Sequence, residues 1–181
     1  MQDFYSDEII EVVLSEKTIR TRVKELAEEI SGDYEGMPVT LIGTLKGSVY
    51  FLADLSRELK LFQEIDFIKA SSYGMGSTSS LDVKIEFSPY DKLEGKHVLW
   101  IEDIIDTGNT AVHLQKHLLE QKPASLKLVS LLNKPERRVH HDVYIHYLGF
   151  TIPDKFVVGY GLDYAGKYRN LSYIGAINFN K

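Results

Sequence analysis

A short apolar run that ends in acidic residues constrains the fold of this 181-residue chain more than any other feature. Residues 98–101 (Val-Leu-Trp-Ile) are continuously apolar with a β-branched bias, which is typical of a strand buried on both faces of a parallel sheet. Glu102 and Asp103 follow directly, so we expect them at the carboxyl end of this strand. The pattern predicts an α/β protein.

Residues 106–110 (Asp-Thr-Gly-Asn-Thr) should form a tight turn into a helix that carries Ala111, Leu114 and Leu118 on one face. The first turn of a helix leaves backbone N–H groups unpaired, and two threonine hydroxyls add further donors. The turn therefore predicts a phosphate cradle. Because Asp and Thr are also ordinary cap residues, a capped helix without a ligand remains the alternative.

Three carboxylates crowd this turn, namely Glu102, Asp103 and Asp106. Like charges about 4 Å apart repel by about 4 kcal/mol at an effective dielectric constant of about 20. A divalent cation such as Mg²⁺, which prefers hard oxygen ligands, would relieve that repulsion, and sugar hydroxyls could donate to the same oxygens. A ligand with a phosphate and a ribose diol, together with Mg²⁺, would satisfy both the three carboxylates and the N–H and hydroxyl donors of the turn.

The same order of strand and polar turn occurs elsewhere in the chain. Residues 39–45 form a buried-strand pattern that ends at Lys46, and residues 126–132 form another that ends just before Lys134. Residues 65–70 read as a further strand. Since the carboxyl ends of parallel strands meet at one edge, both lysines should reach the edge where open α/β sheets bind ligands. The simpler alternative for each lysine is a solvated charge at a strand end.

Two other segments have clear local signals. Ser15 is predicted to cap a helix that ends near residues 31–32. Residues 71–80 are rich in Gly and Ser without apolar periodicity, so we expect a flexible loop there, or alternatively a plain surface linker. Alternation over residues 83–87 predicts a half-exposed strand on which this loop returns.

Composition narrows the classes of partner and compartment. A net charge of −5 and a pI near 5.7 disfavour nucleic acids and anionic membranes as main partners. The absence of cysteine excludes disulfides, thiol nucleophiles and cysteine-ligated zinc. We find no targeting signal, no apolar run of about 18 residues and no linker, and therefore expect a single cytoplasmic domain over residues 1–181.

Residues 98–110 resemble the phosphoribosyl pyrophosphate (PRPP) signature of the type I phosphoribosyltransferases, and the Ile-Ile pair at 104–105 resembles the hypoxanthine-guanine branch. The resemblance implies a mostly parallel twisted sheet flanked by helices as a core over about 35–150. It also implies a flexible loop and a small base-binding hood from about 1–15 and 151–181. The implied residues for the ribose and 5′-phosphate of PRPP are Glu102, Asp103, Asp106, Thr107, Gly108, Asn109 and Thr110.

The resemblance further implies purine salvage, in which hypoxanthine or guanine reacts with PRPP to give IMP or GMP and pyrophosphate. Asp106 would be the general base, and the peptide before Lys46 can be cis in this family. The other implied residues are Lys46, Gly47 and Arg169 for pyrophosphate, Lys134, Phe156, Val157 and Asp163 for the purine, Ser72 and Tyr73 in the flexible loop, and Glu102, Asp103 and Asp163 for Mg²⁺. The resemblance also implies a homodimer or homotetramer.

Alternatives remain open at this point. A PRPP- or nucleotide-sensing regulator of the same fold, a non-catalytic metabolite-binding domain and a xanthine-preferring enzyme would carry similar motifs. Asn133 stands where bacterial relatives often have aspartate, and Ala165-Gly166 also departs from them, so the rank order of bases stays open. The simplest interpretation of His140, His141 and His146 is that they are surface or strand-edge histidines.

Overall fold

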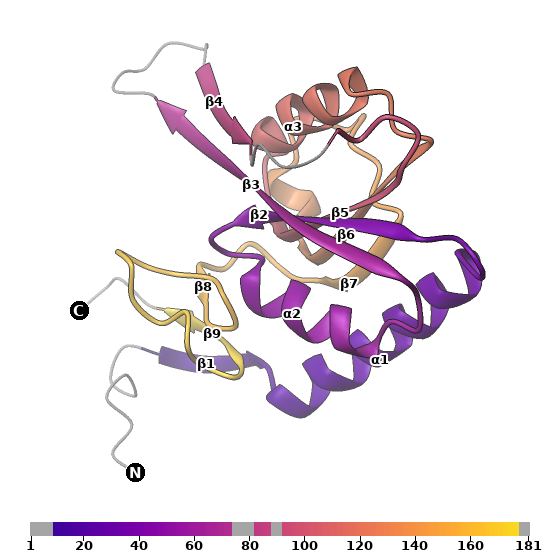
Figure 1. Cartoon of the computed structure of the whole chain (residues 1–181). Helices are drawn as coiled ribbons and strands as arrows, with labels where there is room; N and C mark the ends of the chain where they lie inside the picture. Colours follow the sequence, from indigo (N-terminus) through magenta and orange to yellow (C-terminus); the bar gives the residue numbers. More distant parts are fainter. Residues whose placement is uncertain (1–8, 74–81, 88–91, 178–181) are drawn as a thin grey trace.

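A six-stranded sheet in the order β4-β3-β2-β5-β6-β7 forms the centre of the computed structural model, which describes residues 9–73, 82–87 and 92–177. Helix α3 covers one face of the sheet, and α1 and α2 cover the other (Figure 1). The elements in chain order are β1 (Ile9–Leu14), α1 (Glu16–Asp33), β2 (Val39–Leu45), α2 (Val49–Glu58), β3 (Gln63–Tyr73), β4 (Asp82–Phe87), β5 (His97–Ile105), α3 (Asn109–Glu120), β6 (Ser125–Asn133), a 3-10 turn (Pro135–Arg137), β7 (Tyr147–Thr151), β8 (Val157–Val158) and β9 (Ile174–Ile177).

The sheet is parallel except at one edge. Strands β3, β2, β5, β6 and β7 run in the same direction, and β4 pairs antiparallel with β3. The central strands β2 and β5 are buried along most of their length, as expected of strands covered by helices on both faces. The predicted mostly parallel α/β fold is confirmed.

Side chains alternate between two hydrophobic cores along β5. Leu99 and Ile101 pack in the core beneath α1 and α2, whereas Val98 and Trp100 pack in the core beneath α3. Because successive residues of a strand face opposite sides, Glu102 continues the face of Trp100, and Asp103 continues the face of Ile101. The two acids therefore leave the strand on different sides of the sheet.

A small second sheet joins the two ends of the described chain. Strand β1 pairs antiparallel with β9, which also pairs antiparallel with β8. This sheet lies beside the end of the main sheet toward which the β3 arrow points (Figure 1). It corresponds to the hood that we expected from the chain ends, and it stands next to the carboxyl ends of the parallel strands.

Two predicted boundaries are wrong. Ser72 and Tyr73 belong to β3, where they pair with Val83 and Asp82, because the antiparallel ladder continues beyond the apolar pattern. Residues 74–80 of the predicted loop lie outside the described residues. Strand β5 also continues past Ile101, since β6 still pairs with it there. Glu102 and Asp103 therefore lie within the strand and not after it.

Among the described helices, none has the length and apolar character needed to cross a membrane.

Candidate active site

The turns that follow β2, β5 and β6 converge at the carboxyl edge of the sheet. The backbone N–H of Lys134 donates to the carbonyl of Ile105 at 3.0 Å, which joins the β6 turn to the end of β5. The β2 turn approaches so closely that a Cβ atom on Gly47 would lie 1.6 Å from Oδ2 of Asp103. The peptide bond between Leu45 and Lys46 is cis. The turns that carry Lys46 and Lys134, which the sequence predicts at one edge of the sheet, therefore both contact the end of β5.

The turn after β5 forms a small cavity at the start of α3. Gly108 adopts φ +88° at the N-cap, and the N–H of Asn109 donates to Oγ1 of Thr107 at 3.3 Å. The cavity has a volume of about 100 Å³, which is several times the share of one water in the liquid, about 30 Å³. It is lined by Glu102, Ile104, Ile105, Asp106, Thr107, Gly108, Thr110 and Ala111. A helix N-terminus beside a cavity of this size suits a phosphate group.

A segment after β6 packs against this turn, and no pattern in the sequence predicted this contact. The backbone N–H groups of Val139 and His140 donate to the carbonyl of Thr107 at 2.9 and 3.2 Å. Nε2 of His140 lies 2.7 Å from Oδ1 of Asn109, so this half-buried histidine also contacts the turn. Spacing along the chain gives no signal for this contact, because it depends on how the segment returns across the turn.

Arg137 also contacts a predicted site residue, although no pattern in the sequence pointed to it. Its Nε lies 3.3 Å from Oδ1 of Asp106 and 4.0 Å from Oδ1 of Asp154. Asp106 is partly exposed and faces the turn that carries Lys134. The arrangement gives Asp106 a cationic neighbour on the side of the 3-10 turn.

Asp163 and Arg169 form an ion pair in the hood. Nη2 of Arg169 lies 2.6 Å from Oδ1 of Asp163, and its Nη1 donates to the carbonyl of Gly161 at 2.6 Å. The N–H of Gly166 donates to the other carboxylate oxygen of Asp163 at 2.8 Å. Charges on both residues act on the pKa of Asp103, which places this pair on the Asp103 side of the sheet.

Glu102 is 5% exposed and lies on the opposite side. Oγ1 of Thr44 and Nε1 of Trp100 donate to its Oε1 at 2.5 and 3.0 Å. Burial raises the pKa of Glu102 to about 8, and the charge of Asp103 adds to this rise. Burial also raises the pKa of Asp103 to about 6. Both carboxylates thus lie where negative charge is unfavourable without a compensating ligand.

The three carboxylates predicted to bind Mg²⁺ do not meet in one place. Within the described ranges, no group of three or more His, Cys, Asp or Glu side chains is arranged to hold a metal ion. Asp103 and Asp163 share the hood side, and Glu102 faces the α3 side because of strand alternation. Two carboxylates with substrate phosphates and water still make an adequate Mg²⁺ site, since Mg²⁺ retains several non-protein ligands.

The raised pKa values predict that the free energy of unfolding of the ligand-free protein falls as pH rises. Glu102 and Asp103 have ordinary pKa values of 4.5 and 3.8, so between these and the folded values the folded state binds more protons than the unfolded state. Stability that is present at low pH is therefore lost as pH rises through the folded pKa values. Thermal unfolding from about pH 5 to about pH 8, without divalent cations, measures this contribution.

Glu102→Gln is the matched control for this measurement, because the amide retains the shape of the side chain and does not titrate. We expect the melting temperature of this variant to fall by fewer degrees than that of the wild type over the same pH range. Parallel curves for the two proteins would contradict the assigned titration of Glu102.

The predicted purine-binding residues occupy the hood and the β6 turn. Phe156 is 43% exposed and lies edge-on to Tyr164, with ring centroids 5.7 Å apart. Val157 begins β8, and the buried Lys134 donates from Nζ to the carbonyl of Lys155. An exposed aromatic face beside a buried ammonium group forms one wall on which a planar polar ligand could stack.

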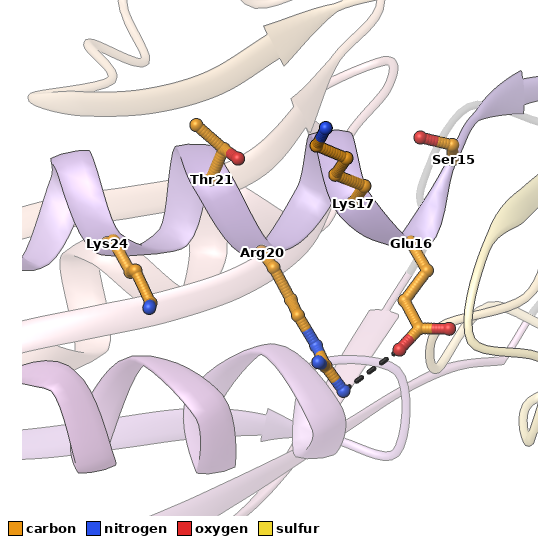
Figure 2. Close-up of a pocket in the computed structure, with 6 residues that line it drawn as sticks. All are labelled: Ser15, Glu16, Lys17, Arg20, Thr21 and Lys24. Atoms are coloured by element: carbon orange, nitrogen blue, oxygen red, sulfur yellow. Dashed lines mark ion pairs between the residues drawn. The ribbon is translucent and has the colours of Figure 1, made fainter.

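A larger hollow of about 420 Å³ lies along α1 and contains none of the predicted site residues. Figure 2 shows its lining side chains along one stretch of the helix, with an ion pair of 2.9 Å between Arg20 and Glu16. The lining residues are Ser15, Glu16, Lys17, Arg20, Thr21 and Lys24. All six are exposed, so this hollow is open to solvent and does not enclose a ligand.

Comparison with known proteins agrees with this geometry. The family described as "Phosphoribosyl transferase domain" matches residues 11–165. The hypoxanthine phosphoribosyltransferase of Escherichia coli (strain K12) is 45% identical over 170 residues, which cover 93% of this chain and 95% of that protein. A solved hypoxanthine phosphoribosyltransferase from Staphylococcus aureus has a TM-score of 0.93 and 42% identity, covering 98% of this chain and 96% of that chain. A solved hypoxanthine-guanine phosphoribosyltransferase from Bacillus anthracis has a TM-score of 0.89 and 46% identity, covering 94% of this chain and 100% of that chain.

Proposed function

Because the chain belongs to the phosphoribosyltransferase family, we propose that it transfers the 5-phosphoribosyl group of PRPP to hypoxanthine or guanine and releases pyrophosphate. The resemblance found in residues 98–110 is confirmed by this membership, and the function is purine salvage. The observation that carries the proposal is the meeting of the β5 phosphate turn with the lysine-bearing turns of β2 and β6 at one edge.

We assign the 5′-phosphate of PRPP to the cavity at the start of α3. The donors there would be the backbone and hydroxyl groups of residues 107–110, of which Thr107, Gly108 and Thr110 line the cavity. Glu102 and Asp103 would accept hydrogen bonds from the ribose hydroxyls, one from each side of β5. The pyrophosphate would then lie against Lys46, the backbone of Gly47 and Arg169, where cationic and N–H groups favour an anion.

The purine would lie in the hood with its ring on Phe156 and its edge against the backbone of Val157, near Asp163. Truncating a stacking aromatic to alanine costs about 1–3 kcal/mol in base-binding proteins, so Phe156 is a sizeable anchor. The ammonium of Lys134 would donate to the 6-oxo group. Adenine carries an amine at this position and would present donors to a donor, so the site favours 6-oxopurines.

Asp103 and Asp163 fit Mg²⁺ because they are neighbouring acids on the side where the pyrophosphate would bind. When bound, Mg²⁺ neutralises negative charge on the leaving pyrophosphate. The bond that breaks joins ribose C1 to a pyrophosphate oxygen, so positive charge develops on the sugar and negative charge on the leaving group. Lys46, the amides near Gly47 and Arg169 would stabilise the leaving group, and Asp106 would take the N7 proton of the attacking purine.

The test combines purified protein with PRPP, MgCl₂ and one base at a time, and follows ultraviolet absorbance and pyrophosphate release. Turnover with hypoxanthine and guanine, and none with adenine, is expected. Turnover with xanthine alone would identify the xanthine-preferring alternative. Binding of PRPP without turnover of any base would indicate a sensing regulator instead.

A homodimer or homotetramer is part of the same proposal. Phe62 is 90% exposed beside a cavity of about 320 Å³ at the amino end of the sheet, opposite the candidate active site. Phe62 is the most exposed large apolar side chain of the described residues, and we infer that a second subunit covers it. The molar mass in solution, measured by light scattering, tests the oligomeric state.

A further inference from the structure

Trp100 and Thr44 form a buried hydrogen-bonded group with Glu102. Trp100 is 1% exposed, and its Nε1 lies 2.9 Å from Oγ1 of Thr44 and 3.0 Å from Oε1 of Glu102. The Thr44 hydroxyl donates to the same Oε1 at 2.5 Å. Since β2 and β5 are neighbouring parallel strands, the three side chains meet on the α3 face of the sheet.

Two of the three hydrogen bonds of this group end at Oε1 of Glu102, and the third joins Trp100 to Thr44. The indole N–H is a donor only, and the Thr44 hydroxyl accepts from it while its own single proton goes to Oε1. No hydrogen bond within the described part of the chain reaches Oε2 of Glu102. Glu102 also lines the cavity that contains the phosphate turn. Oε1 is therefore fixed by the protein, and Oε2 is left to a ligand.

Packing alone does not account for the choice of these side chains. Apolar side chains of similar size would fill the same space without the cost of burying a hydroxyl and an indole N–H. Here the hydrogen bond between Trp100 and Thr44 orients both side chains, and each of them donates to Glu102. We propose that Trp100 and Thr44 are positioning residues that fix Glu102 in the orientation in which Oε2 accepts from a ribose hydroxyl of PRPP. This inference rests on the proposed function.

Thr44→Val tests the proposal because valine keeps the shape of threonine and removes only the hydroxyl. We expect the KM for PRPP to rise about tenfold, as for the loss of a hydrogen bond to a charged group, while the KM for hypoxanthine stays at the wild-type value. Trp100→Phe should have the same effect, and the double variant should change KM by less than the product of the two single effects. Thr40→Val is the matched control, since Thr40 is buried in the same strand outside the candidate active site.

Two results would overturn the proposal. One is a wild-type KM for PRPP in Thr44→Val, and the other is an equal rise in Thr40→Val, which would indicate general loosening of β2. Failure of the proposed function is distinguishable from both. Trp100 is the only tryptophan of the chain, so its fluorescence reports PRPP binding at Glu102 directly. A wild-type protein without turnover and without a fluorescence response to PRPP would refute the function itself, whatever the variants do.

Discussion

Asp106→Asn should lower kcat by about 10²–10⁴-fold, which is the range for loss of a general base. Asparagine keeps the size of the side chain and its place beside Arg137, but it cannot accept a proton from the purine. We expect the KM for PRPP to stay near the wild-type value, because the phosphate turn itself is unchanged. Steady-state kinetics with each substrate varied in turn separate the two parameters.

Asp154→Asn is the control for charge near Arg137, because Asp154 is the other carboxylate beside its guanidinium group. Oδ1 of Asp154 also lies 3.8 Å from Nζ of Lys134, and any effect through Lys134 is measured separately as a change in the KM for hypoxanthine. If the ion pair with Arg137 mattered more than proton transfer, both variants would lose activity alike. A normal kcat for Asp106→Asn would remove the general-base role from this residue.

Gly161→Ala should push the hood away from the turn after β2, where Lys46 and Gly47 are proposed to bind pyrophosphate. A Cβ atom at this position would lie 2.0 Å from the backbone oxygen of Gly47, and Gly161 has φ +105°. Left-handed strain of about 1–2 kcal/mol and overpacking of about 1–3 kcal/mol together predict a loss of about 2–5 kcal/mol in the free energy of unfolding. Since 1 kcal/mol corresponds to roughly 2–4 °C in a domain of this size, the melting temperature should fall by roughly 4–20 °C.

The same variant should also weaken PRPP binding, because the carbonyl of Gly161 accepts a hydrogen bond from Arg169 and the loop beside Gly47 must move. Gly166→Ala is the matched control: Gly166 has φ +81°, but a Cβ there would meet no atom within 4 Å. It carries the backbone strain without the collision. Equal losses of stability in the two variants would show that the close approach to Gly47 is not what matters.

Local patterns predicted the elements of the fold well. Ser15 caps α1 as expected, with Oγ accepting from the N–H of Thr18 at 3.1 Å, and the buried residues of α1 follow the apolar spacing. The strand predicted after the loop is β4. The errors fell at strand ends, at Ser72 and Tyr73 in β3 and at Glu102 and Asp103 in β5, because partner strands extended the ladders beyond the apolar residues.

By itself, the sequence determined the parallel sheet, the helix start after Asp106 and the delivery of Lys46 and Lys134 to one edge. These follow from periodicity and turn chemistry, which act between residues close together in the chain. The roles of the individual predicted site residues remain predictions that the experiments above test.

Only the tertiary structure decided which groups touch. Pairing with β6 continued β5 past Ile101, which placed Glu102 and Asp103 within the strand and on opposite faces of the sheet. The register between β2 and β5 brought Thr44 against Trp100 and Glu102. The return of the chain after β6 brought His140 to Asn109 and Arg137 to Asp106. Such contacts depend on how distant segments pair and pack. The hydrophobic pattern of a strand repeats every two residues, so it excludes a register shift of one residue but does not distinguish shifts of two.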